Sequence, residues 1–297
     1  MKRKALIFFI LALIILSSCS QQAEQPKTDE KKDKVSEELV KIQESNKTAI
    51  EDLEKIMEKV EEPIFVEVKD EADKKQEEES GGGETGGSEG QEQGQGQQPL
   101  IPPEEKTYEE KKEEENIKKQ EEIEKMWMSL STKVEGIHNS WNNFKITAIE
   151  EGVDTKSIAT TDSALNSLTI AIGKKELMTS IKEGNKMTLS LANYFDVYKG
   201  NVQGDFNRIT YTVTETYIQA LEDNWDKAQS IALEYEEYFS RLRQKIELEK
   251  KDEKLLDTLE ISIRDLISSL KYKDADLVKI KRGVVLTNIE RVNEAAK

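Results

Sequence analysis

The chain has 297 residues, a formal net charge of −16 and 35% charged residues, with one Cys and one His. A single Cys excludes an internal disulfide framework and any Cys-rich zinc site. A single His excludes the multi-His clusters of most catalytic zinc and non-haem iron sites. The acidic balance argues against nucleic acid as a partner, because phosphate binding needs a surplus of Lys and Arg.

The N-terminus joins a basic segment to a short apolar one. Lys2, Arg3 and Lys4 precede an uninterrupted apolar run over residues 5–16. Such a run is too short to span a bilayer comfortably, which takes about 20 residues. A basic segment followed by a short apolar core is typical of a secretory signal peptide. We therefore predict a signal peptide over residues 1–18.

The apolar run ends in Leu16-Ser17-Ser18-Cys19, which contains the only Cys of the chain. This resembles the lipobox of bacterial lipoprotein precursors, in which an aliphatic residue and two small residues precede an invariant Cys. The resemblance covers only about the first 22 residues. It implies cleavage before Cys19, transfer of diacylglycerol to its thiol, and a protein anchored by lipid to the outer face of the cell membrane. An uncleaved N-terminal anchor is the alternative.

Two segments of the predicted mature chain lack any apolar period. One spans residues 19–32, and the other spans residues 69–103 and is rich in Gly, Glu and Gln. Such compositions bury too little apolar surface to offset the conformational entropy lost on folding. They predict a disordered tether and a flexible, self-repelling linker. The linker is interpreted either as a spacer for the distal domain or as low-complexity sequence without a role.

Residues 33–68 carry a heptad pattern that predicts one amphipathic or coiled-coil helix. Its a positions are Leu39, Asn46, Leu53 and Val60, and its d positions are Val35, Ile42, Ala49 and Ile56. Two interpretations stay open. The 35–60 helix either associates with a second copy of itself or packs against the distal domain.

Residues 104–297 predict one all-α domain, an antiparallel bundle of five or six helices. Thr107 and Glu110 match the capping box that opens a helix. Apolar stripes at helical spacing then mark successive helices, with Asp154 and Asp205 as predicted N-caps and with Asp274 and Asp276 as two candidates for the N-cap of the last helix. The longest predicted stripe after residue 200 runs without interruption from Asp205 to Ile246 and is interpreted as one helix.

The sequence offers no catalytic constellation that we recognise. A general base needs an orienting carboxylate and a nucleophile within reach, and only Glu135 is acidic among the helical neighbours of His138. We expect His138 to be a surface or hydrogen-bonded residue. We also expect no cofactor, no metal ligand set and no enzymatic activity. A hydrolase would require His138 to lie beside a carboxylate pair in an open cleft.

Aromatic residues are the other candidate functional feature. Tyr joins an apolar ring to a polar tip and suits interfaces and ligand grooves, although aromatic residues at helical spacing usually pack in a core. The predicted interaction residues are Tyr194, Tyr198, Tyr235 and Tyr238.

Two functions follow as expectations. The leading one is a membrane-anchored extracytoplasmic lipoprotein that acts as a non-enzymatic helical interaction or binding module on an acidic tether, with an unidentified protein partner. The alternative is an accessory lipoprotein that binds a solute or cation between its helices.

Lipidation can be tested at the one thiol. Cys19→Ala, or treatment of cells with globomycin, should shift the protein out of the membrane fraction, because the two acyl chains that hold it there would be missing. Membrane fractionation and immunoblotting measure the shift. An unchanged membrane fraction would count against the anchor.

Overall fold

The computed structural model describes residues 34–66 and 106–296, and every regular element in these ranges is helical, which confirms the all-α prediction. The signal peptide, Cys19, the tether and the 69–103 linker lie outside the described residues. The elements are α2 (Glu37–Glu61), α4 (Tyr108–Glu150), α5 (Thr155–Gly173), α6 (Leu177–Phe195), α7 (Gln203–Leu221), α8 (Trp225–Leu233), α9 (Tyr235–Lys245), α10 (Glu253–Ser269), a 3-10 turn (Leu270–Tyr272) and α11 (Ala275–Ala295).

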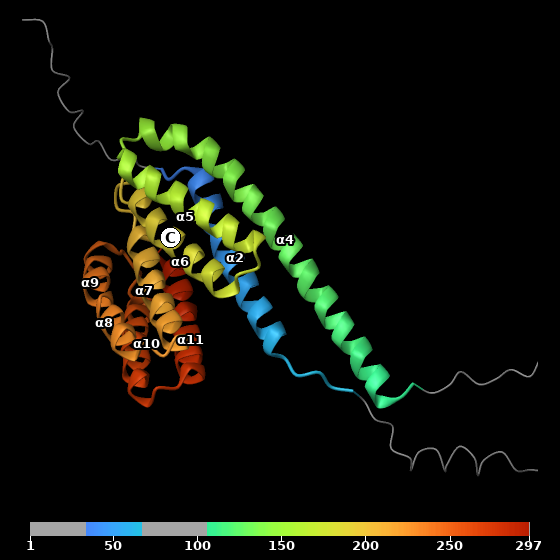
Figure 1. The fold of residues 1–297 in the computed structure, drawn as a ribbon. Coiled ribbons are helices and arrows are strands. Elements are labelled where there is room, and N and C mark those ends of the chain that lie inside the picture. The colour runs from blue at the N-terminus through green and yellow to red at the C-terminus, as the bar shows by residue number, and fades with distance from the viewer. Residues whose placement is uncertain (1–33, 67–105, 297) are drawn as a thin grey trace, which may run out of the picture.

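The heptad helix α2 is part of the bundle and packs against α4 and α6 (Figure 1). Its predicted stripe is buried from Leu39 to Ile56, whereas Val60 near its end is half exposed. The stripe belongs to the same apolar core as the helices that follow residue 106. Of the two interpretations of this helix, the structure therefore shows packing against the distal domain. Self-association stays a prediction, and in this fold the stripe that would mediate it is already covered.

The contact between α2 and α6 depends on one small residue and one buried amide. A Cβ atom at Gly184 would lie 2.9 Å from Cγ1 of Ile50, so α6 approaches α2 closely at this glycine. One turn earlier on α2, the Asn46 side chain donates to the Gly184 carbonyl at 3.1 Å and to the Thr188 hydroxyl at 2.9 Å. Helix α6 continues through Gly184 and Asn185 without interruption.

Helix α4 has 43 residues and is therefore about 65 Å long. Its predicted capping box is confirmed, because the Thr107 hydroxyl accepts from the Glu110 N–H and the Glu110 carboxylate accepts from the Thr107 N–H. The first buried residue of the helix is Ile123. The turns before it extend past the main body of the bundle (Figure 1). This agrees with the sparse apolar pattern of those turns.

The predicted helix from Asp205 to Ile246 is wrong, since the structure divides it into α7, α8 and α9. The chain leaves α7 through Asp223, whose φ of 57° is left-handed and ends a helix. The apolar stripe runs on in phase through α8 and α9, which is why periodicity alone gave one helix. The bundle accordingly has more and shorter helices than the five or six predicted.

Asp205 is also not the N-cap that was predicted. It lies inside the first turn of α7 with no exposed surface, and Val202 precedes the helix instead. The Asp205 carboxylate accepts from Arg241 Nε at 3.0 Å and from Lys245 Nζ at 2.8 Å. Both cations come from α9, so this buried acid joins α9 to α7. The predicted caps Asp154 and Asp274 are confirmed, with bonds of 2.9 and 2.8 Å.

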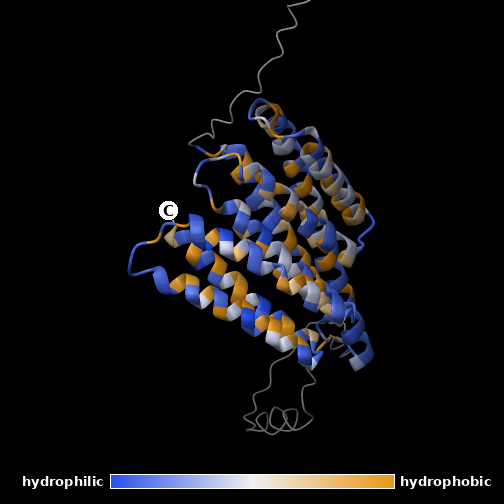
Figure 2. Ribbon diagram, turned by 90° about the vertical axis from the view of Figure 1, so that its left-hand side faces the viewer, coloured by the Kyte–Doolittle hydropathy of each residue, from blue (hydrophilic) through white to orange (hydrophobic). Residues whose placement is uncertain are grey.

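Hydropathy varies within each helix rather than between helices. Figure 2 shows hydrophilic and hydrophobic residues mixed along every described helix. None of the helices in 34–66 and 106–296 is long and apolar enough to cross a membrane.

The close approach at Gly184 can be tested with a matched glycine. We expect Gly184→Ala to lower the free energy of unfolding by about 1 kcal/mol, because the new methyl group overpacks against Ile50. Gly136→Ala, inside α4 with open space around its Cβ position, should raise it by about 0.5–1 kcal/mol. Urea denaturation measures both. Equal effects at the two sites would contradict the packing argument.

Candidate functional site

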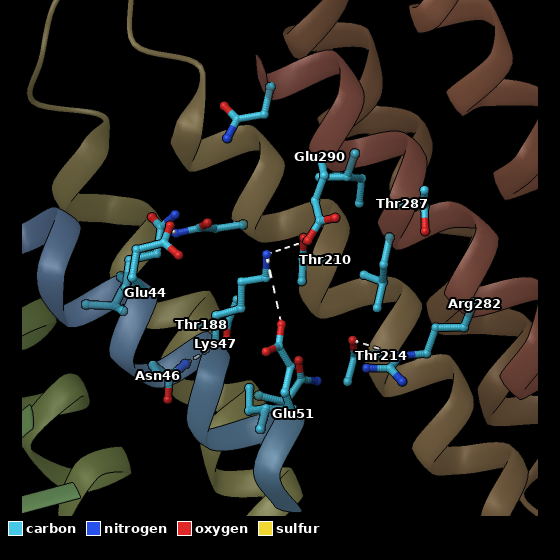
Figure 3. Close-up of a pocket in the computed structure, with 18 of the residues that line it drawn as sticks. Glu44, Asn46, Lys47, Glu51, Thr188, Thr210, Thr214, Arg282, Thr287 and Glu290 are labelled. Carbon is cyan, nitrogen blue, oxygen red and sulfur yellow. Dashed lines mark hydrogen bonds and ion pairs between the residues drawn. The ribbon is translucent and has the colours of Figure 1, made fainter. Parts of the chain in front are cut away.

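A cavity of about 280 Å³ lies between α2 and α11, with residues of α6 and α7 as its floor (Figure 3). We call it the α2–α11 cavity. The helices α2 and α11 flank it over equal lengths, from Gln43 to Glu54 on one side and from Arg282 to Asn293 on the other. Apolar atoms come from Ile50, Leu191, Leu286 and Ile289, and the remaining lining is mostly amide, hydroxyl and charged groups.

Side chains bridge the space between the two flanking helices. The ion pairs are Lys47 with Glu290, Glu54 with Arg282 at 2.7 Å, and Glu58 with Lys279 at 2.9 Å. Residue numbers rise along α2 as they fall along α11, so the helices run antiparallel. The cavity includes the interval between the first two ion pairs and extends past Lys47 to Gln43 and Asn293.

Arg282 closes the inner end of the cavity. It is 5% exposed, and its Nε donates to the Thr214 hydroxyl of α7 at 3.2 Å. Its guanidinium carbon lies 5.4 Å from the centre of the Tyr217 ring, a cation–π distance. With the Glu54 ion pair, these contacts hold a buried charge in a fixed position.

Lys47 stands at the open end, where its ammonium points toward Glu290 and toward Glu51, 4.0 Å away (Figure 3). About half of each of these three side chains is exposed. Burial lowers the pKa of Lys47, but the hydrogen bond and charge of Glu290 outweigh it and leave the pKa above its ordinary value. The ammonium therefore stays charged at neutral pH.

Two buried amides of the lining have an unused acceptor. Asn46 and Asn185 are each 1% exposed, and the Oδ1 atom of each accepts no hydrogen bond from the described residues. Their donors are engaged, since Nδ2 of Asn185 donates to the Tyr211 carbonyl and to Glu215, both at 3.2 Å. A buried polar atom without a partner costs about 1–3 kcal/mol, so it requires an explanation.

The arrangement suits binding better than bond making. Its apolar side chains can cover the body of a small ligand, and its polar groups can fix the ligand's orientation, which is the usual construction of a small-molecule site. Each of its two cations already has a carboxylate partner in the chain.

The predicted interaction residues Tyr194 and Tyr198 lie in the core rather than on the surface. Tyr194 packs edge-on against Trp141 and Phe144, with ring centres 5.4 and 5.6 Å away. Burial raises its pKa to about 12. The Tyr198 hydroxyl donates to Glu151 at 2.6 Å and accepts from the Ser36 N–H at 3.3 Å, so it holds the start of α2 beside the end of α4.

The other predicted pair lies on α9. Tyr235 is buried, while Tyr238 is half buried with its ring 5.1 Å from the Arg241 guanidinium carbon. Neither residue lines the α2–α11 cavity, and the structure does not bring the α6 pair and the α9 pair into one patch. A role for these tyrosines in partner binding stays a prediction.

His138 contacts a hydroxyl, not a carboxylate pair. Its Nε2 atom lies 2.7 Å from the Thr169 hydroxyl, which itself donates to the Leu165 carbonyl at 2.8 Å. Within the described ranges, no group of His, Cys, Asp and Glu side chains is placed to hold a metal ion.

Sequence reasoning missed the cavity residues. Lys47, Glu51 and Glu54 read as the solvated face of an amphipathic helix, and Arg282 as one charge among many in α11. One signal was available, since Asn46 interrupts an apolar stripe and a polar residue there usually has a specific partner. The partner itself, on α6, is set only by the fold.

Comparisons of the chain with protein-family models, with curated proteins and with solved structures give no match.

The buried ion pair can be compared with an exposed one. We expect Arg282→Met to lower the free energy of unfolding by about 3 kcal/mol, because Glu54 would lose its partner in a site where water replaces it poorly. Arg264→Met removes a pair of similar length, 2.6 Å to Glu260, from the helix surface and should cost less than about 0.5 kcal/mol. Denaturant titration measures both variants, and equal losses of unfolding free energy in the two would contradict the burial argument.

Proposed function

We propose that this protein is a lipid-anchored extracytoplasmic lipoprotein whose helical domain is a non-enzymatic binding module, with a small solute held between α2 and α11. The observation that carries the solute site is the α2–α11 cavity itself, in which four apolar side chains lie among polar and charged groups. Its volume of about 280 Å³ is near the lower end of the range for small-molecule sites.

The lipid anchor rests on the lipobox resemblance at Cys19 and on the acidic, Gly-rich composition between the anchor and the domain. Such a tether would hold the domain near the membrane, while its negative charge would keep it away from an anionic lipid surface. A binding domain placed in this way samples solutes on the outer side of the membrane.

A protein partner is the second candidate, and the exposed start of α4 favours it. Tyr108 and Ile117 are each 50% exposed on turns that have few contacts with the rest of the bundle. These turns are accessible to another protein.

The solute site can be tested by filling its mouth. Gly283 lines the cavity, and a Cβ atom there would meet nothing within 4 Å, so a larger side chain fits without strain. A panel of sugars, amino acids, amines and carboxylates is screened by thermal melting, where a bound ligand raises the melting temperature. We expect Gly283→Trp to abolish the rise.

The matched control is Gly136→Trp, which places the same side chain in equally open space on α4, away from the cavity. It should leave the rise unchanged. A panel in which no solute stabilises the protein, or a rise that survives Gly283→Trp, would contradict the proposed site.

A further inference from the structure

The α2–α11 cavity is elongated along its two flanking helices. Its lining covers twelve residues of α2 and twelve of α11, which is about 16 Å along each helix. A ligand that contacts the lining over this length is an extended chain.

The charges of the lining favour a cation. Carboxylates come from Glu44, Glu51, Glu54 and Glu290, whereas Lys47 and Arg282 are the cationic residues among those lining the groove. The formal charge of the lining is therefore negative even with both cations in place. Low-dielectric walls strengthen the attraction of such a groove for positive ligands and its repulsion of anions.

The unpaired atoms of the lining are acceptors. Oδ1 of Asn46 and Oδ1 of Asn185 are buried and accept nothing, while the amide donors of both residues are bonded within the protein. The amide donor of Asn207 is likewise bonded, to the Gln43 side chain at 3.3 Å. Any ligand group that reaches these two oxygens must be a hydrogen-bond donor.

Lys47 shows what the open end of the groove holds. Its side chain is an unbranched alkyl chain with a terminal ammonium, and the ammonium lies between the carboxylates of Glu51 and Glu290. A free alkylamine would meet the same two carboxylates there. Its methylene groups would lie along Ile50 and Leu286.

From length, charge and hydrogen-bond complementarity, we propose that the α2–α11 cavity binds a linear aliphatic polyamine. This deepens the proposed solute site and rests on it. The ammonium groups would donate to the carboxylates, and the apolar side chains of the lining would cover the methylene segments between them.

The test uses the full-length protein in detergent and isothermal titration with spermidine at 150 mM salt, which screens distant charges. The chain-length controls are 1,8-octanediol, which is neutral, and octanedioate, which is anionic. We expect one spermidine per chain and weaker or absent binding of both controls. Octanediol or octanedioate binding as tightly as spermidine, or no spermidine binding, would overturn the polyamine assignment.

Two double variants distinguish binding in the cavity from nonspecific attraction of spermidine to an acidic protein, because each removes two negative charges from a different place. Glu51→Gln with Glu290→Gln should weaken spermidine binding about tenfold. Glu236→Gln with Glu237→Gln removes the same charge from the exposed face of α9 and should change it less than twofold. Equal weakening in the two double variants would mean that spermidine binds the acidic surface and not the cavity.

A variant that binds spermidine more tightly is an informative test, because a variant that unfolds would lose binding instead. Lys47→Met keeps a side chain of similar length but removes the ammonium group that pairs with Glu51 and Glu290. Spermidine should therefore bind about tenfold more tightly. Lys118→Met removes the cationic partner of an exposed carboxylate on α4 and should leave the affinity for spermidine unchanged. Unchanged or weaker binding in Lys47→Met would overturn the proposed ammonium position.

The outcomes separate this inference from the function on which it rests. If octanediol or octanedioate binds instead and Gly283→Trp abolishes that binding, the cavity is a solute site but not a polyamine site. If the solute panel and spermidine all fail to bind, both proposals are wrong.

Discussion

The docking of α2 against α6 is the contact on which the rest of this structure depends. At Gly184 the two helices come so close that a methyl group would collide with Ile50, and Asn46 uses its amide donors to fix the register. Tyr198 adds a third point by binding the N–H of Ser36 at the start of α2. A helix that is remote in sequence from the bundle is thereby placed at its centre.

The position of α2 also creates the cavity. Helix α2 packs its apolar stripe against α4 and α6, so its opposite, charged side faces α11 across a gap. Long side chains cross this gap as ion pairs, whereas the helix backbones stay apart. The pair of Lys47 with Glu290 lies at the surface and contributes little to stability, whereas the buried pair of Glu54 with Arg282 helps to hold α11 beside α2.

The same arrangement links the site to the segment outside the bundle. Helix α2 follows the predicted tether in sequence and forms one whole wall of the cavity. A ligand that contacts both α2 and α11 would add to the free energy that keeps α2 docked, because it binds only the assembled groove. Binding at the proposed site would therefore be thermodynamically coupled to the docking of α2.

The sequence by itself determined which segments are helical, where the helices at Thr107, Asp154 and Asp274 begin, and which side of α2 is buried. These features depend on local hydrogen bonds and on the 3.6-residue period, and both can be read along the chain. Only the tertiary structure decided what covers that side, where the helix predicted from Asp205 to Ile246 divides, and that Lys47 meets Glu290. Periodicity gives the direction of a buried face but not the surface that covers it, because that surface is contributed by helices distant in the sequence, α4 and α6.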